Sequence, residues 1–79
     1  MIGNIQHLSR LGKGSKGIVH HLIGGRRISD RLLVLGFTKG AKVSVIQNPG
    51  FGPVIVCVRD TRIALGRGEA DKVLVERLS

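Results

Sequence analysis

Three histidines and one cysteine are the side chains of this 79-residue chain best suited to binding a metal ion. His20 and His21 are adjacent in a segment typical of a β-strand, where successive side chains point to opposite faces. We therefore expect their rings to diverge and not to chelate one ion together. Cys57 lies in the most apolar run of the chain and is expected to be buried as a small hydrophobic residue. With His7 distant in sequence, we expect no metal site, no cofactor and no tightly bound metal after purification.

A glycine-rich segment, Gly12-Lys13-Gly14-Ser15-Lys16-Gly17, has the GxGxxG spacing of loops that hold dinucleotide phosphates. In dinucleotide-binding folds that loop joins a strand to a helix, whose N-terminus receives the pyrophosphate. Here the residues that follow, 18–23, are typical of a strand, and the chain is too short for such a fold. We interpret the segment as a turn that enters a strand.

The hydroxyl and carboxyl side chains form no catalytic pattern. No serine lies in a Gly-x-Ser-x-Gly motif, and the five Asp and Glu residues are scattered, mostly beside Arg or Lys. Such carboxylates are typical of a charged surface rather than of an acid–base pair. We expect the protein not to be an enzyme.

The chain is strongly basic, with 13 Lys and Arg against five Asp and Glu and a net charge of +8. This excess is concentrated in the first half, where Arg26, Arg27 and Arg31 form the main cluster. Arg27 and Arg31 are four residues apart, so they share one face if a helix begins early enough. The cluster is either a surface that binds an acidic partner or an ordinary solvated helix face, and the residues alone leave both open.

Short apolar runs separated by glycine predict five β-strands, over 18–23, 41–47, 53–59, 63–65 and 72–78. Residues 59–62 predict a tight turn that joins the third and fourth strands in a hairpin. Ile28, Leu32 and Leu35 instead have helical spacing, which predicts a helix over 28–35 with Ser29 or a neighbour as its N-cap. Gly36 is expected to end this helix in the left-handed conformation. A second helical turn is expected over 67–71.

These elements predict a mainly β fold, a small and partly open five-stranded barrel with one short helix, as a single domain over residues 1–79. No apolar stretch is long enough for a transmembrane helix, and the N-terminus lacks the features of a signal peptide, so we expect a cytoplasmic protein. The alternating apolar residues of the strands are expected to supply most of the core: Val19, Val43, Val45, Val54, Val56, Ile63, Leu65, Val73 and Val75.

Nearly the whole chain resembles the ferrous iron transport protein A (FeoA) family. The most specific part is Arg31-Leu32-Leu33-Val34-Leu35-Gly36-Phe37-x-x-Gly40-x-x-Val43, and Leu8-x-x-Leu11 and Gly52-Pro53-Val54-x-Val56 also match. One departure is Lys39, where family members often have proline. The resemblance implies an SH3-like barrel and a cytosolic accessory protein for the membrane ferrous iron permease with a cytosolic GTPase domain (FeoB-like). It implies no catalytic residue, and we expect Arg26, Arg27 and Arg31 to contact that partner.

A second hypothesis concerns nucleic acid. Gly14-x-x-Gly17-x-Val19 also resembles the KOW element of ribosomal and transcription-factor barrels, and a charge of +8 suits contacts with phosphates. The chain has no Tyr or Trp on which unpaired bases could stack. A third reading, a metal-sensing barrel detached from a repressor, lacks the helix-turn-helix that would read DNA.

Overall fold

The computed structural model describes residues 4–78, which form six strands, two α-helices and one 3₁₀ helix. In chain order these are β1 (Asn4–His7), η1 (Leu8–Arg10), β2 (Lys16–Leu22), α1 (Arg26–Leu35), β3 (Lys42–Gln47), β4 (Val54–Val58), β5 (Thr61–Leu65), α2 (Arg67–Ala70) and β6 (Val73–Leu78). Within residues 4–78, none of the helices has the length and apolar character needed to cross a membrane.

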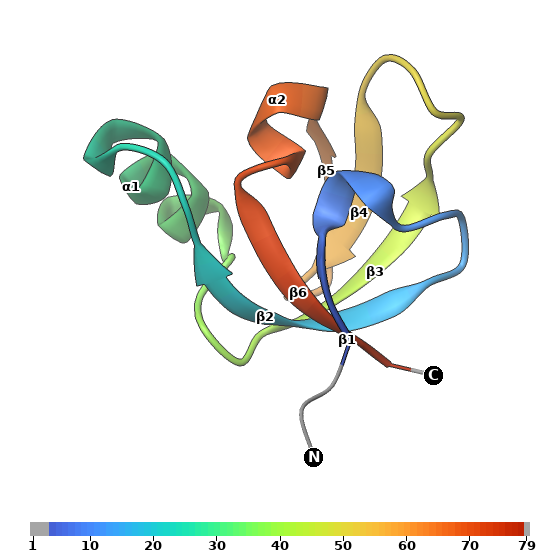
Figure 1. The fold of residues 1–79 in the computed structure, drawn as a ribbon, viewed down its shortest axis with the longest axis horizontal. Helices are drawn as coiled ribbons and strands as arrows, with labels where there is room; N and C mark the ends of the chain where they lie inside the picture. Colours follow the sequence, from blue (N-terminus) through green and yellow to red (C-terminus); the bar gives the residue numbers. More distant parts are fainter. Residues whose placement is uncertain (1–3, 79) are drawn as a thin grey trace.

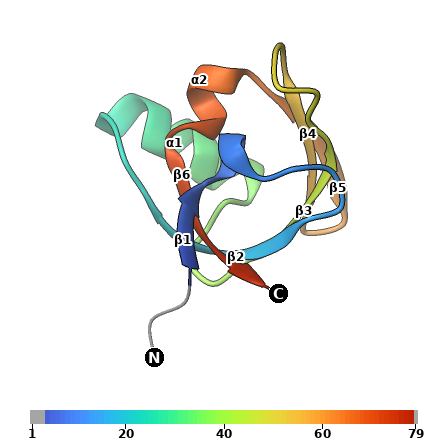
Figure 2. The same cartoon turned by 45° about the vertical axis from the view of Figure 1, so that its right-hand side comes forward.

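All six strands belong to one antiparallel sheet with the order β1-β6-β2-β3-β4-β5. The sheet is strongly curled, so that β4 and β5 lie across the core from β1, β2 and β6 (Figures 1 and 2). β1 and β5 are its edge strands, and the barrel they delimit is partly open. The mainly β architecture is therefore confirmed.

The strand number is corrected from five to six. The five predicted strands are β2 to β6, each within two residues of its predicted bounds, whereas β1 was not predicted. β1 has four residues and a single large apolar side chain, Ile5, and it exists because it pairs with β6 from Asn4↔Arg77 to His7↔Leu74. That pairing spans almost the whole chain, so local alternation carries no sign of it.

The predicted hairpin is β4–β5, in which Val58 pairs with Thr61 across a two-residue turn. Arg59 and Asp60 form the turn with φ of 51° and 62°. Both values lie in the left-handed region, as a type I′ turn requires.

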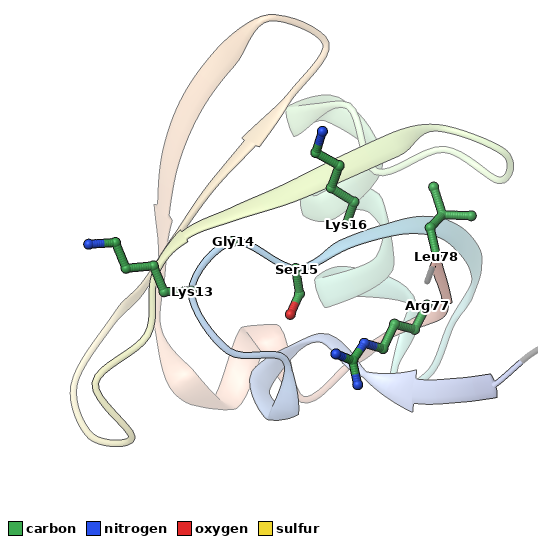
Figure 3. Close-up of a pocket in the computed structure, with 6 residues that line it drawn as sticks. All are labelled: Lys13, Gly14, Ser15, Lys16, Arg77 and Leu78. Carbon is green, nitrogen blue, oxygen red and sulfur yellow. The ribbon is translucent and has the colours of Figure 1, made fainter.

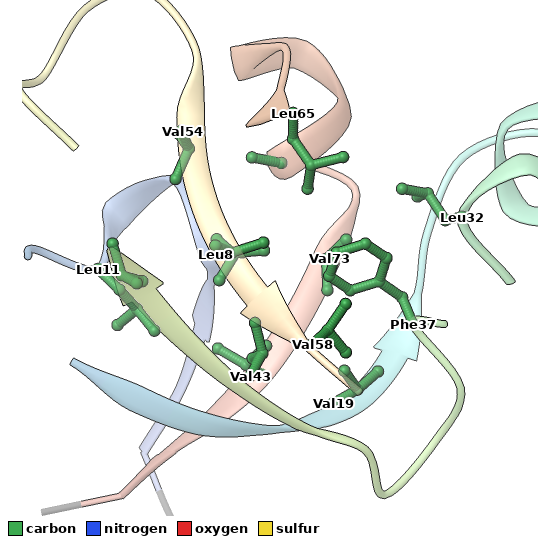
Figure 4. Close-up of a cluster of buried hydrophobic side chains, with 14 of the residues drawn as sticks. Leu8, Leu11, Val19, Leu32, Phe37, Val43, Val54, Val58, Leu65 and Val73 are labelled. Atoms are coloured by element: carbon green, nitrogen blue, oxygen red, sulfur yellow. The ribbon is translucent and has the colours of Figure 1, made fainter. Parts of the chain in front are cut away.

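The core lies inside the curled sheet, as Figure 4 shows. Eight of the nine predicted core residues are buried, and Ile63 is only partly buried against them. The prediction missed Leu8 and Leu11, which close one end of the barrel from η1 and the residue after it, and Phe37 and Ala70. These four lie outside the strands, where period-two alternation does not apply. Ala41 and Val58 are also buried and were not among the predicted nine.

Helix α1 begins at Arg26, two residues before the predicted start. Its N-cap is Gly25, which offers no side chain, so Ser29 is not the cap and lies inside the helix. The predicted apolar stripe is correct: Leu32 is fully buried, and Ile28 and Leu35 are partly buried against the core.

Gly36 ends α1 in the left-handed conformation, with φ 110° and ψ 4°, as predicted. A Cβ atom there would meet Arg59 side-chain carbons at 3.5 Å, an ordinary contact, so the cost of a side chain is backbone strain rather than a clash. Gly36→Ala is therefore expected to lower the free energy of unfolding by about 1–2 kcal/mol, measured by urea denaturation.

Gly12→Ala is the matched control, because Gly12 lacks a positive φ and has open space around its Cβ position. This variant is expected to be as stable as the wild type or slightly more stable. Equal stability of the Gly36→Ala protein and the wild type would contradict the assigned cap.

Candidate functional site

The predicted arginine cluster lies on α1. Arg26, Arg27 and Arg31 are all exposed. The helix begins at Arg26 and therefore includes both Arg27 and Arg31, which are four residues apart and share one face. Arg31 forms a salt bridge with Glu69, with Nε and Oε2 2.7 Å apart, and its side chain is still 67% exposed. Within residues 4–78, Arg26 and Arg27 have no ion-pair partner. Within residues 4–78 the cluster thus contains two arginines without an ion-pair partner, Arg26 and Arg27, and one, Arg31, that is paired with Glu69 of α2.

The position of these two arginines is electrostatically unfavourable for the helix. They occupy the first turn of α1, which contains no acidic residue and has no side-chain capping hydrogen bond. The N-terminus of a helix carries a partial positive charge, so cations there lower helix stability by a few tenths of a kcal/mol or more. An anionic group placed against this end would be attracted by the arginines and by the helix dipole together.

Two large apolar side chains lie on the solvent side of the same helix. Val34 is 87% exposed and Leu33 is 45% exposed. Val34 follows Arg27 by seven residues, which places it on the same side of the helix, away from the stripe that packs on the barrel. We call Arg26, Arg27, Arg31, Leu33 and Val34 the outer face of α1.

Sequence reasoning identified the arginines of this face but missed Leu33 and Val34. The available signal was their helical angle, since both fall off the Ile28, Leu32 and Leu35 stripe that the same periodicity assigns to the core. Apolar residues on the solvated side of a helix are a recognised mark of an interaction surface when they adjoin one another.

The two adjacent histidines contradict the prediction that they diverge. The pairing of β2 with β6 shifts between Val19 and His21, which is a β-bulge at His20. The bulge interrupts the alternation of side chains, and the two Nδ1 atoms lie 2.8 Å apart. Within residues 4–78 no group of three or more His, Cys, Asp or Glu side chains is arranged to hold a metal ion. The absence of a tightly bound metal stays a prediction, but divergence of the rings is not its reason.

Cys57 is half-buried, not fully buried as predicted. It alternates with Val54, Val56 and Val58, which fill the interior, so its side chain lies on the outer surface of β4. An apolar run in a strand does not reveal which of its two faces is covered, because both faces of β4 are apolar.

The glycine-rich segment is a turn that enters β2, as predicted. Gly14 has a φ of 87°, its N–H donates to the Val45 carbonyl at 2.8 Å, and the Ser15 N–H donates to the Gly12 carbonyl at 3.1 Å. These two amides are therefore occupied within the chain and are not free to hold a phosphate.

A shallow hollow beside this turn is lined by Lys13, Gly14, Ser15, Lys16, Arg77 and Leu78. Figure 3 shows that the Lys13 and Lys16 side chains point away from each other and that Arg77 points toward Ser15. The three cations make this end of the molecule positive without converging on one point.

Comparison with known proteins then identifies the family. The model of the FeoA domain family matches residues 6–77. The chain belongs to the FeoA family. A candidate Fe(2+) transport protein A of Methanocaldococcus jannaschii is 39% identical to it over 64 residues, which are 81% of this chain and 77% of the relative.

Solved structures of FeoA proteins have the same fold. A FeoA described as an iron uptake regulatory protein is 37% identical and superposes with a TM-score of 0.90 over 95% of this chain and 100% of its own. FeoA of Stenotrophomonas maltophilia, crystallised with zinc and described as a prokaryotic SH3 domain protein, is 36% identical, with a TM-score of 0.77 over 86% of each chain. The predicted SH3-like fold is confirmed.

A manganese-dependent transcriptional repressor is also similar, with a TM-score of 0.88 over 99% of this chain and 44% of the repressor. The two chains are 18% identical, so this likeness concerns the fold alone. The same barrel thus occurs both in FeoA proteins and as part of a larger regulator.

Proposed function

We propose that this protein is a cytosolic accessory protein of a ferrous iron transport system, and that it acts by binding the GTPase domain of the FeoB-like membrane permease. Membership of the FeoA family supports the transport system. The observation that carries the binding role is the outer face of α1, where two arginines without ion-pair partners in residues 4–78 lie two helical turns before exposed Leu33 and Val34. In the proposed role the protein acts by binding its partner, and it has no catalytic residue or cofactor.

The outer face has the composition of a small protein–protein interface. Helix α1 is held on the barrel by Leu32, Ile28 and Leu35, so its opposite side is presented on a fixed support. A few side chains that are fully buried at the centre of an interface supply most of the affinity, and charged side chains at the rim set the association rate and the choice of partner. Leu33 and Val34 suit the first role, and Arg26 and Arg27 suit the second.

The chemistry of this face indicates an acidic partner surface. The arginines and the positive helix end attract the same sign of charge, and Asp30 is the one acidic side chain in α1. We therefore place an acidic patch on the GTPase domain against the N-terminal half of α1, with an apolar depression receiving Val34. Binding is expected to weaken as ionic strength rises, because exposed charges are screened by salt.

The double reversal Arg26→Glu and Arg27→Glu is expected to weaken binding by at least about tenfold, since placing like charges across an interface costs several kcal/mol. The measurement is calorimetric titration of the purified protein into the purified cytosolic domain of the permease from the same organism, at low and high salt. Stability is expected to change by less than about 0.5 kcal/mol, because both side chains are exposed. The variant is also expected to support less iron uptake in cells.

The matched control is the double reversal Lys13→Glu and Lys16→Glu, which makes the same change of charge at the glycine-rich turn. This variant is expected to bind the permease domain as the wild type does. Both variants are also titrated with a short RNA and a short DNA duplex. The proposal is wrong if the α1 variant binds the permease domain normally. The KOW-type nucleic-acid function replaces it if the wild-type protein binds the nucleic acids but not the permease domain, and the turn variant has lost binding to the nucleic acids.

A further inference from the structure

His20 and His21 lie at a defect in β2 that the proposed partner binding does not use. On one side, β2 pairs with β6 through Val19↔Val75 and His21↔Leu74, so His20 has no partner opposite it. On the other side, the backbone hydrogen bonds between β2 and the residues just before β3 end at Val19. Its N–H donates to the Ala41 carbonyl, and its own carbonyl accepts from the Gly40 N–H, both at 2.8 Å. Beyond that point β2 is free to bend.

The bend brings the two imidazole rings together at the surface. Their Nδ1 atoms are 2.8 Å apart, their centroids are 5.0 Å apart and their planes are inclined by 65°. Both residues are exposed. In a regular strand adjacent rings would lie on opposite faces, so this approach is a direct product of the bulge.

The separation of the nitrogens matches that of two ligands on one metal ion. Imidazole nitrogens bind zinc at about 2.0–2.1 Å, so two of them at a right angle on one ion are about 2.9 Å apart. A tetrahedral angle needs about 3.3 Å by the same geometry, which small rotations of two exposed rings can supply. Without an ion, one Nδ1–H donates to the other Nδ1; with an ion, both rings carry their proton on Nε2, and no proton is lost.

We propose that His20 and His21 form a two-ligand chelating site for one divalent first-row transition ion, bound through both Nδ1 atoms. Neutral imidazole suits Zn²⁺, Fe²⁺, Ni²⁺ and Cu²⁺ and does not suit Mg²⁺ or Ca²⁺. Because residues 4–78 offer no third His, Cys, Asp or Glu ligand in reach, water completes the coordination and the ion exchanges readily. The site therefore loads from solution and is emptied by a chelator.

His7 provides an internal comparison. Its Nδ1 is 2.7 Å from the Asp71 carbonyl oxygen, to which it donates, so this nitrogen is held by the fold. His7 belongs to β1 and has no second histidine beside it. Replacement of His7 removes one imidazole from the protein but leaves the proposed site intact.

The test is calorimetric titration of Zn²⁺ into protein without a histidine tag, for the wild type and for His20→Ala, His21→Ala and His7→Ala. We expect one Zn²⁺ per wild-type chain, and His7→Ala is expected to match it. Each variant of the pair is expected to bind at least about tenfold more weakly, because even groups that only support a metal ligand are worth about 10- to 100-fold in affinity.

Nitrogen-15 NMR of the histidine rings gives a second readout that a general effect on structure would not produce. Zn²⁺ is expected to shift the Nδ1 resonances of His20 and His21 and to leave both rings protonated at Nε2, whereas Mg²⁺ is expected to change neither. The inference is overturned if Zn²⁺ does not bind, if Nε2 is the ligand, or if His7→Ala weakens binding as much as the other two variants. It does not rest on the permease, so binding of Zn²⁺ and binding of the permease domain succeed or fail separately.

Discussion

Leu32→Ala is expected to lower the free energy of unfolding by about 2–4 kcal/mol, a large part of the stability of a domain of this size. Leu32 is fully buried and is the single completely covered side chain of α1. Its removal leaves a cavity between the helix and the barrel, near Phe37 and Val73 in the core (Figure 4). The measurement is urea denaturation followed by far-ultraviolet circular dichroism.

Val34→Ala is the matched control, since it shortens an apolar side chain two residues away in the same helix. Val34 is 87% exposed, and alanine has the higher helix propensity, so this variant is expected to be at least as stable as the wild type. Equal losses of stability in the two variants would show that the buried face of α1 has been assigned incorrectly.

Val34→Glu is expected to reduce affinity for the permease domain by about 30-fold or more, the effect of losing a central contact worth at least about 2 kcal/mol. The proposed interface covers this side chain, and a carboxylate there would be desolvated in the apolar depression that receives Val34. The free protein is expected to keep its fold, because the substituted side chain is exposed. Calorimetric titration under the conditions used for the arginine variants gives the comparison.

Phe51→Glu supplies the control for a general effect of adding a carboxylate to an exposed apolar position. Phe51 is 75% exposed in the β3–β4 loop, which both views place on the side of the molecule opposite α1 (Figures 1 and 2). This variant is expected to bind the permease domain normally. If Phe51→Glu abolishes binding and Val34→Glu does not, the interface lies on the β3–β4 loop and the assignment to α1 is wrong.

The elements that could be predicted were those whose signals are local. Val43 and Val45 alternate with polar residues because one face of β3 is buried, and that pattern is present in the five consecutive residues 41–45. The Gly36 cap was equally visible, since a glycine after an apolar helical stripe is a short-range signal with one common conformation. The signature around Arg31–Val43 also identified the family without any coordinates.

The features that could not be predicted depend on residues far apart in the chain. β1 is a strand because β6 lies beside it, and Leu8 and Leu11 are core residues because the curled sheet needs its end closed. The start of α1 was missed because Gly25 caps it without a side chain and so leaves no polar residue to mark the position.

The candidate sites divide in the same way. The basic residues at positions 26, 27 and 31 and a helix over 28–35 followed from the sequence, whereas the extension of that helix to Arg26 and Arg27 and the 87% exposure of Val34 came from the structure. The histidine pair shows the limit most clearly. A β-bulge is set by how β2 aligns with β6, and a one-residue shift of register moves a side chain to the other face.

By itself, the sequence determined the fold class, the family, the positive charge and most of the core, because burial imposes its period on each strand and helix locally. Tertiary structure alone decided which of the two apolar faces of β4 is covered, where the sheet begins and how His20 and His21 meet. Those outcomes depend on strand register and on the packing of α1 against the barrel, and both are fixed by contacts between segments that are distant in the chain.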